Sequence, residues 1–158
     1  RLYKKGEAPP RVTLTYPDAV LGALCWGWID GQAKKHDEAS RIQRFTPRRK
    51  RSVWSKLNVE RAERLIAEGR MQPPGFAAID AAKADGRWDA AYDTSADVMP
   101  GDFLVALADR PDARAFFETL PKSARFPIVF RLQTAVKPET RARRLATLLD
   151  KLDRGERP

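Results

Sequence analysis

The clearest pattern in the sequence is the helical spacing of apolar residues in its C-terminal segment. Pro138 suits the first position of a helix, where its missing N–H would have no partner, and Gly155 suits the position just past the end. Between them, apolar side chains recur three or four residues apart, at Ala142, Leu145, Leu148, Leu149 and Leu152. The pattern predicts one long helix that begins at Pro138.

Shorter segments show the same signals. Thr15 can cap a helix whose first turn holds Pro17 and Asp18, and Gly69 can end a helix that begins at Ser55 or Asn58. We expect about six helices in all, most of them short, with the others over residues 17–26, 76–85, 101–108, 112–119 and 123–135. Pro127 fits the helix over 123–135 only near its first turn.

Near the N-terminus the period changes from helical to alternating. Leu2 and Tyr3 end an apolar segment, and Val12, Leu14 and Tyr16 alternate with polar residues, which is typical of extended chain. Two further extended pieces, over residues 28–35 and 41–46, flank a polar connector and predict an antiparallel hairpin, which the N-terminal strand could join. Because the strands come first and the helices later, we expect a mostly helical α+β fold with a small antiparallel sheet of two or three strands near the N-terminus.

Charge adds a basic surface to this picture. The chain has 158 residues, 42% hydrophobic and 32% charged, which is typical of one globular domain spanning residues 1–158. Its 30 Lys and Arg residues against 21 Asp and Glu give a net charge of +9. This excess favours an anionic partner such as nucleic acid, an anionic membrane surface or a phosphorylated small molecule; a solvated basic surface without a partner is the alternative.

Residue counts exclude several kinds of catalytic site. Cys25 is the only cysteine and lies in an apolar run, so it forms no intrachain disulfide and is expected to be buried. His36 is the only histidine and lies in a charged run typical of an exposed loop. Neither of the common glycine-rich phosphate-binding motifs occurs. We therefore expect no metal ligands, no cofactor and no catalytic residue of a familiar kind.

The sequence also bears on location. It contains neither a run of about 20 apolar residues, as a membrane-spanning helix requires, nor a visible signal peptide. We expect a cytoplasmic protein. The chain begins at Arg1 without a methionine, which leaves a periplasmic location open.

Carboxylate pairs for acid–base chemistry are not singled out by their spacing. The candidates are Asp30 with Asp37 or Glu38, and Asp85 with Asp89. Because Asp30 precedes a glycine, the simpler expectation is that its side chain bonds the backbone and forms a turn.

The most informative constellation is basic and aromatic. Residues 44–55 hold five cations together with Phe45 and Trp54, and Trp26 and Trp28 lie upstream. Guanidinium groups bind phosphate in a bidentate fork and stack on rings, and cations among exposed aromatic side chains suit single-stranded nucleic acid. The alternative is that the aromatic residues belong to the core and the basic run is a solvated loop.

A second basic cluster lies on the last predicted helix. If that helix packs near residues 44–51, the two clusters would form one anion-binding surface. The candidate ligand-binding residues are then Trp28, Asp30, Arg44, Arg48, Arg49, Trp54, Arg141 and Arg144.

Several strings together resemble the YdeI/OmpD-associated family, also called bacteriocin-protection proteins. Residues 23–31, ALCWGWIDG, resemble the family's ALCFGWIDG with Trp26 in place of Phe. Residues 44–55 resemble its RFTPRR and SxWS segments, residues 69–75 its GxM connector, and residues 135–141 the start of its C-terminal helix. The resemblance covers nearly the whole chain and implies that the family's N-terminal portion is largely missing here.

The resemblance implies no established enzymatic activity and no cofactor. The family name suggests protection against bacteriocins and association with an outer-membrane porin or another envelope protein. Three hypotheses follow. The favoured one is a non-catalytic binding domain for an anionic ligand, either a phosphorylated metabolite or nucleic acid. The others are a stress-resistance or antimicrobial-peptide-resistance protein that acts through a protein partner at the envelope, and an enzyme with an unfamiliar site around Asp30 and Arg44.

Overall fold

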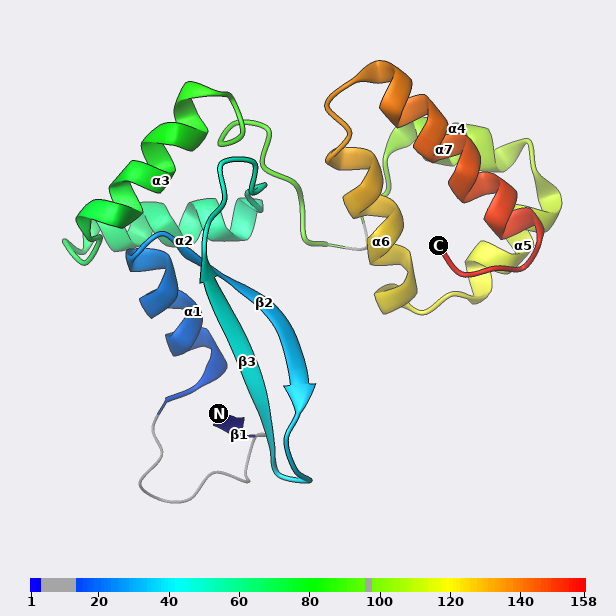
Figure 1. Ribbon diagram of the computed structural model, residues 1–158. Helices are drawn as coiled ribbons and strands as arrows, with labels where there is room; N and C mark the ends of the chain where they lie inside the picture. Colours follow the sequence, from blue (N-terminus) through cyan, green and yellow to red (C-terminus); the bar gives the residue numbers. More distant parts are fainter. Residues whose placement is uncertain (4–13, 96–97) are drawn as a thin grey trace. The chain divides into compact units, whose positions relative to one another are not determined.

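Two compact groups of elements make up the structure, a computed structural model that describes residues 1–3, 14–95 and 98–158 (Figure 1). The N-terminal unit comprises residues 1–54 and 58–91, and the C-terminal unit comprises residues 55–57 and 92–158. Among the described residues there are seven helices and one three-stranded sheet, close to the expected content. The single domain expected over residues 1–158 stays a prediction.

The sheet of the N-terminal unit is the predicted antiparallel hairpin with the N-terminal strand added. Strands β1 (Leu2–Tyr3), β2 (Trp28–Lys35) and β3 (Ser40–Pro47) lie in the order β1-β3-β2. Asp30 pairs with Phe45 in β3, and the register shifts between Asp30 and Ala33. The turn expected at Asp30 is therefore wrong, because strand pairing extends through this position.

Helix α1 (Tyr16–Cys25) begins where Thr15 was expected to cap it. The Thr15 hydroxyl accepts from the Asp18 backbone N–H, and the Asp18 carboxylate accepts in return from the Thr15 N–H at 3.1 Å. The extended stretch expected through Tyr16 therefore ends at the cap, since Tyr16 is already helical. Of the other residues in that stretch, Val12 lies outside the described residues.

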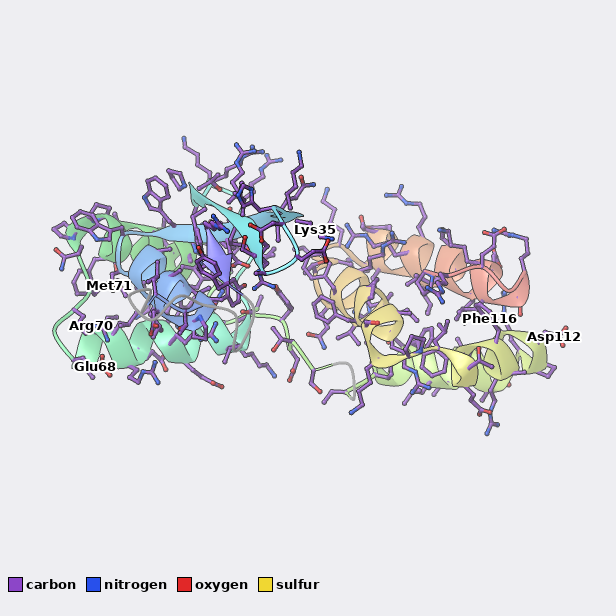
Figure 2. The ribbon with its side chains drawn as sticks, turned by 90° about the horizontal axis from the view of Figure 1, so that it is seen from below. Lys35, Glu68, Arg70, Met71, Asp112 and Phe116 are labelled. Atoms are coloured by element: carbon purple, nitrogen blue, oxygen red, sulfur yellow. The ribbon has the colours of Figure 1, made fainter. Side chains whose placement is uncertain are left out.

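Helices α2 (Lys56–Ala67) and α3 (Pro73–Ala84) follow the sheet. Helix α2 is closed at Gly69, which has a φ of +67° and donates its N–H to the Ile66 carbonyl. Figure 2 labels Glu68 and Arg70 at this end of α2, where the two side chains form an ion pair at 3.0 Å. Helix α3 begins three residues earlier than expected because its first turn accepts Pro73 and Pro74.

The three helices bury a core that holds the expected apolar positions. Its members share exposures of 7% or less, and they are Leu24, Cys25, Trp54, Ala62, Leu65, Met71, Ile79, Ala82 and Trp88. The buried position predicted for Cys25 is confirmed. All four tryptophans of the chain lie in the N-terminal unit, so tryptophan fluorescence reports on this unit alone.

The C-terminal unit contains helices α4 (Gly101–Ala108), α5 (Pro111–Thr119), α6 (Lys122–Gln133) and α7 (Pro138–Asp153). Helix α7 is the long helix predicted from the apolar spacing, and Gly155 follows it with a φ of +67°. Helix α6 contains Pro127 beyond its first turn, a position where proline removes one helical hydrogen bond. The core of this unit is formed by Phe103, Leu107, Ala113, Phe117, Leu120, Ile128, Leu132, Leu148, Leu149 and Leu152.

Helices α1 and α3 meet backbone to backbone at two glycines. A Cβ on Gly27, which has a φ of +71°, would lie 2.6 Å from the Pro74 carbonyl oxygen. A Cβ on Gly75 would collide with the Cys25 carbonyl oxygen and with the Met71 sulfur. A backbone hydrogen bond also joins the two segments, since the Gln72 N–H donates to the Cys25 carbonyl at 3.0 Å. The close approach of the two backbones requires glycine at positions 27 and 75.

Alanine substitutions test this contact. We expect Gly27→Ala and Gly75→Ala each to lower the free energy of unfolding of the N-terminal unit by about 1–3 kcal/mol, from left-handed strain at the first and steric overlap at both. Gly22→Ala is the control, since a Cβ there meets nothing within 4 Å in the middle of α1, and we expect it to stabilise by about 0.5–1 kcal/mol. Urea unfolding followed by tryptophan fluorescence measures all three. Equal stabilities for the three variants would contradict the close approach of α1 and α3.

Candidate functional site

A cleft of about 470 Å³ opens on the surface of the N-terminal unit beside the contact between α1 and α3. Its walls come from the junction of α1 and β2, from the end of β3 and the loop that follows it, from one side of α3, and from Arg87 beyond the end of α3. The lining residues are Trp26, Gly27, Trp28, Pro47, Arg48, Arg49, Lys50, Pro74, Ala77, Ala78, Ala81 and Arg87. The cleft therefore combines indole rings, small apolar side chains and cations.

The four tryptophans divide into two exposed and two buried rings. Trp26 and Trp28, at the cleft, are 54% and 41% exposed, whereas Trp54 and Trp88 are 1% and 7% exposed. Large aromatic side chains are normally buried in a core, where they contribute most to stability. The two indoles at the cleft are thus available to contact a ligand.

The basic loop at residues 47–52 is held in place on both sides. The Arg48 backbone N–H donates to the Gly27 carbonyl at 3.0 Å, which ties the loop to the end of α1. The Arg49 N–H donates to the Ser52 hydroxyl, and the Ser52 N–H returns a bond to the Arg49 carbonyl, each at 2.9 Å. These bonds close a tight turn and present the side chains of Arg49 and Lys50 at the rim.

Arg87 anchors the same loop from the far end of α3. Its Nη1 donates to the Ser52 carbonyl at 2.8 Å, and its Nε donates to the Asp85 carboxylate at 2.8 Å. Its Nη2 donates to the Ala81 carbonyl at 3.2 Å. Because its donors bind the protein itself, Arg87 positions the loop.

Arg48 and Trp54 form a stacked pair behind the loop. The Arg48 guanidinium lies 3.6 Å from the centroid of the Trp54 ring, and its Nη1 donates to the Val53 carbonyl at 3.1 Å. Trp54 packs in turn on Trp88, with centroids 4.9 Å apart. Trp54 therefore supports Arg48 from the core, and its burial keeps the indole from contacting a ligand directly.

Arg49 and Lys50 differ from Arg48, which stacks on Trp54, and from Arg87, which pairs with Asp85. Both are exposed, and among the residues that the structure describes neither forms an ion pair. Arg49 also borders a second, smaller hollow of about 240 Å³ on the other side of Pro47, where Arg44 and Thr46 contribute lining atoms. Arg44 likewise has no ion pair with any described carboxylate. Of the predicted set, Trp28, Arg48 and Arg49 thus line the cleft, and Arg44 lines the second hollow, which shares Pro47 and Arg49 with the cleft.

Asp30 lies apart from this group. Its carboxylate accepts a hydrogen bond from the Tyr16 hydroxyl at 2.7 Å, on the face of the hairpin that α1 covers. Its neighbours Ile29 and Gly31 line the second hollow together with Arg44, so Asp30 and Arg44 lie on opposite faces of β2 and β3. Partial burial and the bond to Asp30 together raise the pKa of Tyr16 to about 12.

Arg141 and Arg144 belong to the C-terminal unit and contact residues of that unit. The Arg141 guanidinium forms a bidentate pair with Asp102, with both N–O distances at 2.7 Å, which lowers the pKa of the Asp102 carboxyl below its usual range. Its Nη1 donates to the Leu132 carbonyl at 2.6 Å. Arg144 donates to the Arg131 carbonyl at 2.7 Å. Both arginines connect α7 to neighbouring segments of the C-terminal unit.

Three of the aromatic and charged residues that line the cleft were not among the candidates predicted from sequence: Trp26, Lys50 and Arg87. Trp26 and Lys50 lie next to candidates in the sequence, so the basic and aromatic signal already included them. Arg87 comes after the glycine that closes α3, and nothing in its neighbourhood distinguishes it from any exposed arginine. Only the fold, which returns the end of α3 to the loop, places it here.

Metal-binding clusters and membrane-spanning helices are absent from the described part of the chain. Its His, Cys, Asp and Glu side chains nowhere gather in threes that could hold a metal ion. None of its helices has both the length and the apolar composition needed to cross a membrane.

Comparison with known families divides the chain in a similar way. Residues 98–155 match the family described as "Bacteriocin-protection, YdeI or OmpD-Associated". This segment of the chain is therefore similar to members of that family. Residues 1–78 match a different family, described as a domain of unknown function (DUF8412). No curated protein and no solved structure gave a match.

The resemblance noted in the sequence is therefore confirmed for the YdeI/OmpD-associated segment at residues 98–155, which includes the start of α7. The two N-terminal strings, at residues 23–31 and 44–55, lie within the stretch that matches the domain of unknown function. These two strings supply most of the cleft, so the cleft lies outside the segment matched by the YdeI/OmpD-associated model.

The Tyr16 to Asp30 bond predicts a pH-dependent stability. Because the pKa of Tyr16 is raised above its ordinary value of 10.0, the bond stabilises fully below pH 10 and the contribution is lost as the pH rises towards 12. We expect Tyr16→Phe to lower the free energy of unfolding of the N-terminal unit by about 1 kcal/mol at neutral pH, with the difference from wild type vanishing at high pH. Urea unfolding followed by tryptophan fluorescence across this range measures it. A constant difference at every pH would show that the Tyr16 hydroxyl is not bonded to Asp30.

Proposed function

We propose that the cleft of the N-terminal unit binds an anionic ligand. The observation that carries the proposal is the pair of exposed cations, Arg49 and Lys50, which form no ion pair with a described carboxylate and line a cleft with two exposed indoles. The other two cations that line the cleft are held by the protein: Arg48 stacks on Trp54, and Arg87 bonds Asp85 and Ser52. Exposed cations are ordinary on a surface, but two of them on a fixed turn at a cleft supply charge where a ligand would bind.

The roles of the side chains follow from their placement. Arg49 and Lys50 would contact phosphate or carboxylate groups, with Arg49 able to form a bidentate pair and Lys50 acting as a point charge. Trp26 and Trp28 would contact a planar or apolar part of the ligand. Arg48 and Arg87 would hold the loop, so that little order is lost when the ligand binds.

Electrostatics of the unit supports the same assignment. Residues 1–54 and 58–91 contain 17 Lys and Arg against 11 Asp and Glu, a formal charge of +6, whereas the C-terminal unit has 13 against 10 and a charge of +3. The segment from Arg44 to Arg51 contains five cations and no acidic residue. An anion approaching the N-terminal unit is therefore attracted towards the loop that borders the cleft.

Adjacent charge reversals test the proposal. Lys50 lines the cleft and Arg51 does not, although both are exposed and follow one another in the same turn. We expect Lys50→Glu to weaken binding of inorganic tripolyphosphate by about tenfold or more, because a charged contact is replaced by a repulsive one. Arg51→Glu changes the net charge by the same amount and is expected to weaken it much less.

Tryptophan fluorescence measures these affinities, since Trp26 and Trp28 flank the bound anion. Far-UV circular dichroism of both variants checks that the fold is unchanged. Equal losses for the two variants would mean a diffuse charge effect, and no binding by the wild type to tripolyphosphate or to a nucleoside monophosphate would refute the proposal.

The family match favours a second candidate, protection against bacteriocins or related stress through a protein partner of the envelope. It rests on the description of the family that residues 98–155 match. The enzyme considered around Asp30 and Arg44 has less support, since the two side chains lie on opposite faces of the hairpin. The cytoplasmic location stays a prediction.

A survival assay separates the two candidates. In cells that lack their own copy of the gene, we expect expression of the chain to raise survival under bacteriocin if the second candidate holds. Lys50→Glu should then protect as well as wild type, because the segment that matches the family does not include the cleft. A loss of protection with Lys50→Glu but not with Arg51→Glu would instead make anion binding part of the protective activity.

A further inference from the structure

The cleft and the second hollow lie on either side of one short piece of chain. Pro47 and Arg49 line both, so the two hollows adjoin at these residues. Arg44 from β3 lines the second hollow. Lys50, Arg49 and Arg44 thus border successive parts of one surface, which we call the basic track. A single phosphate group could engage only one end of it.

The open form of the cleft also bears on the ligand. Pockets for small metabolites generally bury most of the ligand surface. In this cleft, Trp26 and Trp28 are 54% and 41% exposed, so the wall that they form is open to solvent. Exposed aromatic rings next to a track of cations are the arrangement by which proteins bind single-stranded nucleic acid, where bases stack on the rings and the backbone follows the charges.

The side chains that line the cleft offer few hydrogen-bonding groups for recognising individual bases. The described residues that line the cleft contribute indoles, proline, glycine, alanine and cations, and no carboxylate or carboxamide side chain is among them. Without such acceptor side chains the cleft cannot bond the amino groups by which adenine and cytosine are read. Stacking on indoles tolerates any base.

We infer that the ligand of the cleft is single-stranded nucleic acid, bound with little sequence preference, its bases stacked on Trp26 and Trp28 and its phosphates along the basic track. The inference rests on the proposed anion-binding function. It goes further because it requires a ligand with several phosphate groups and with bases that can stack on the indoles. A duplex keeps its bases stacked on one another and would meet only the cations.

The test compares four probes by titration at low and moderate salt. They are thymidine monophosphate, an oligothymidine of about ten nucleotides, a duplex that contains the same strand, and inorganic polyphosphate of similar charge. We expect the oligothymidine to bind at least about tenfold more tightly than the monophosphate and the duplex, with quenching of tryptophan fluorescence. Its affinity should fall with salt with a log–log slope of about −2, as for some three phosphates contacted on a single strand.

Matched aromatic variants separate stacking from charge. We expect Trp26→Ala and Trp28→Ala each to weaken oligothymidine binding about tenfold while leaving polyphosphate binding unchanged. Phe76→Ala is the control, because this ring is on α3 with the same 41% exposure as Trp28 but does not line the cleft. Fluorescence anisotropy of a labelled oligothymidine reads out these variants without relying on the removed indole.

The outcomes distinguish the two levels of the proposal. If monophosphate, polyphosphate or duplex binds as tightly as the oligothymidine, or if the tryptophan variants bind it normally, the nucleic-acid inference is overturned while anion binding stands. If none of the four probes binds to the wild type, both the nucleic-acid inference and the proposed anion binding fail. Tight binding of the single strand alone, lost in the tryptophan variants and kept in Phe76→Ala, establishes the inference.

Discussion

The contact between the end of α1 and the start of α3 determines where every part of the cleft lies. The Cys25 carbonyl accepts from the Gln72 N–H, and Gly27 and Gly75 let the two backbones approach more closely than any side chain would permit. Trp26 and Trp28 flank Gly27, so their indoles emerge at this junction. The Gly27 carbonyl then accepts the Arg48 N–H and brings the basic loop to the same place. The left-handed backbone at Gly27 is therefore a requirement of the site as well as of the fold.

The arginines around the cleft divide into those that build it and those that face outward. Arg48 spreads its guanidinium over a buried indole, and Arg87 bonds a carboxylate and the loop backbone. Charged groups used in this way lose mobility and become part of the scaffold. Arg44, Arg49 and Lys50 are exposed, and none of them forms an ion pair with a described carboxylate. Their mutual repulsion is a small cost at the surface, and a bound anion would remove it.

The sequence was sufficient to predict the elements but not the site. Apolar spacing and capping residues located the hairpin and α7, because these signals depend on neighbours within one or two turns. They failed at Asp30, where pairing with Phe45 overrode the local preference for a turn, and at the start of α3, where two prolines fit the first turn. Which tryptophans are exposed depends on contacts between distant segments. The same is true of Arg87, whose role exists only because α3 returns to the basic loop.

The arginines of the C-terminal unit show why net charge alone is a poor guide to function. Arg110 bonds Asp150 and Asp153, Arg141 forms a bidentate pair with Asp102, and Arg154 bonds Glu156. On this unit the positive charge is largely neutralised by nearby carboxylates and serves to hold α7 and the C-terminal residues in place. The basic segment at residues 44–51 carries no acidic residue at all. The net charge of the chain therefore combines two kinds of basic surface, and the one that we propose binds an anion lies outside the segment that matches the bacteriocin-protection family.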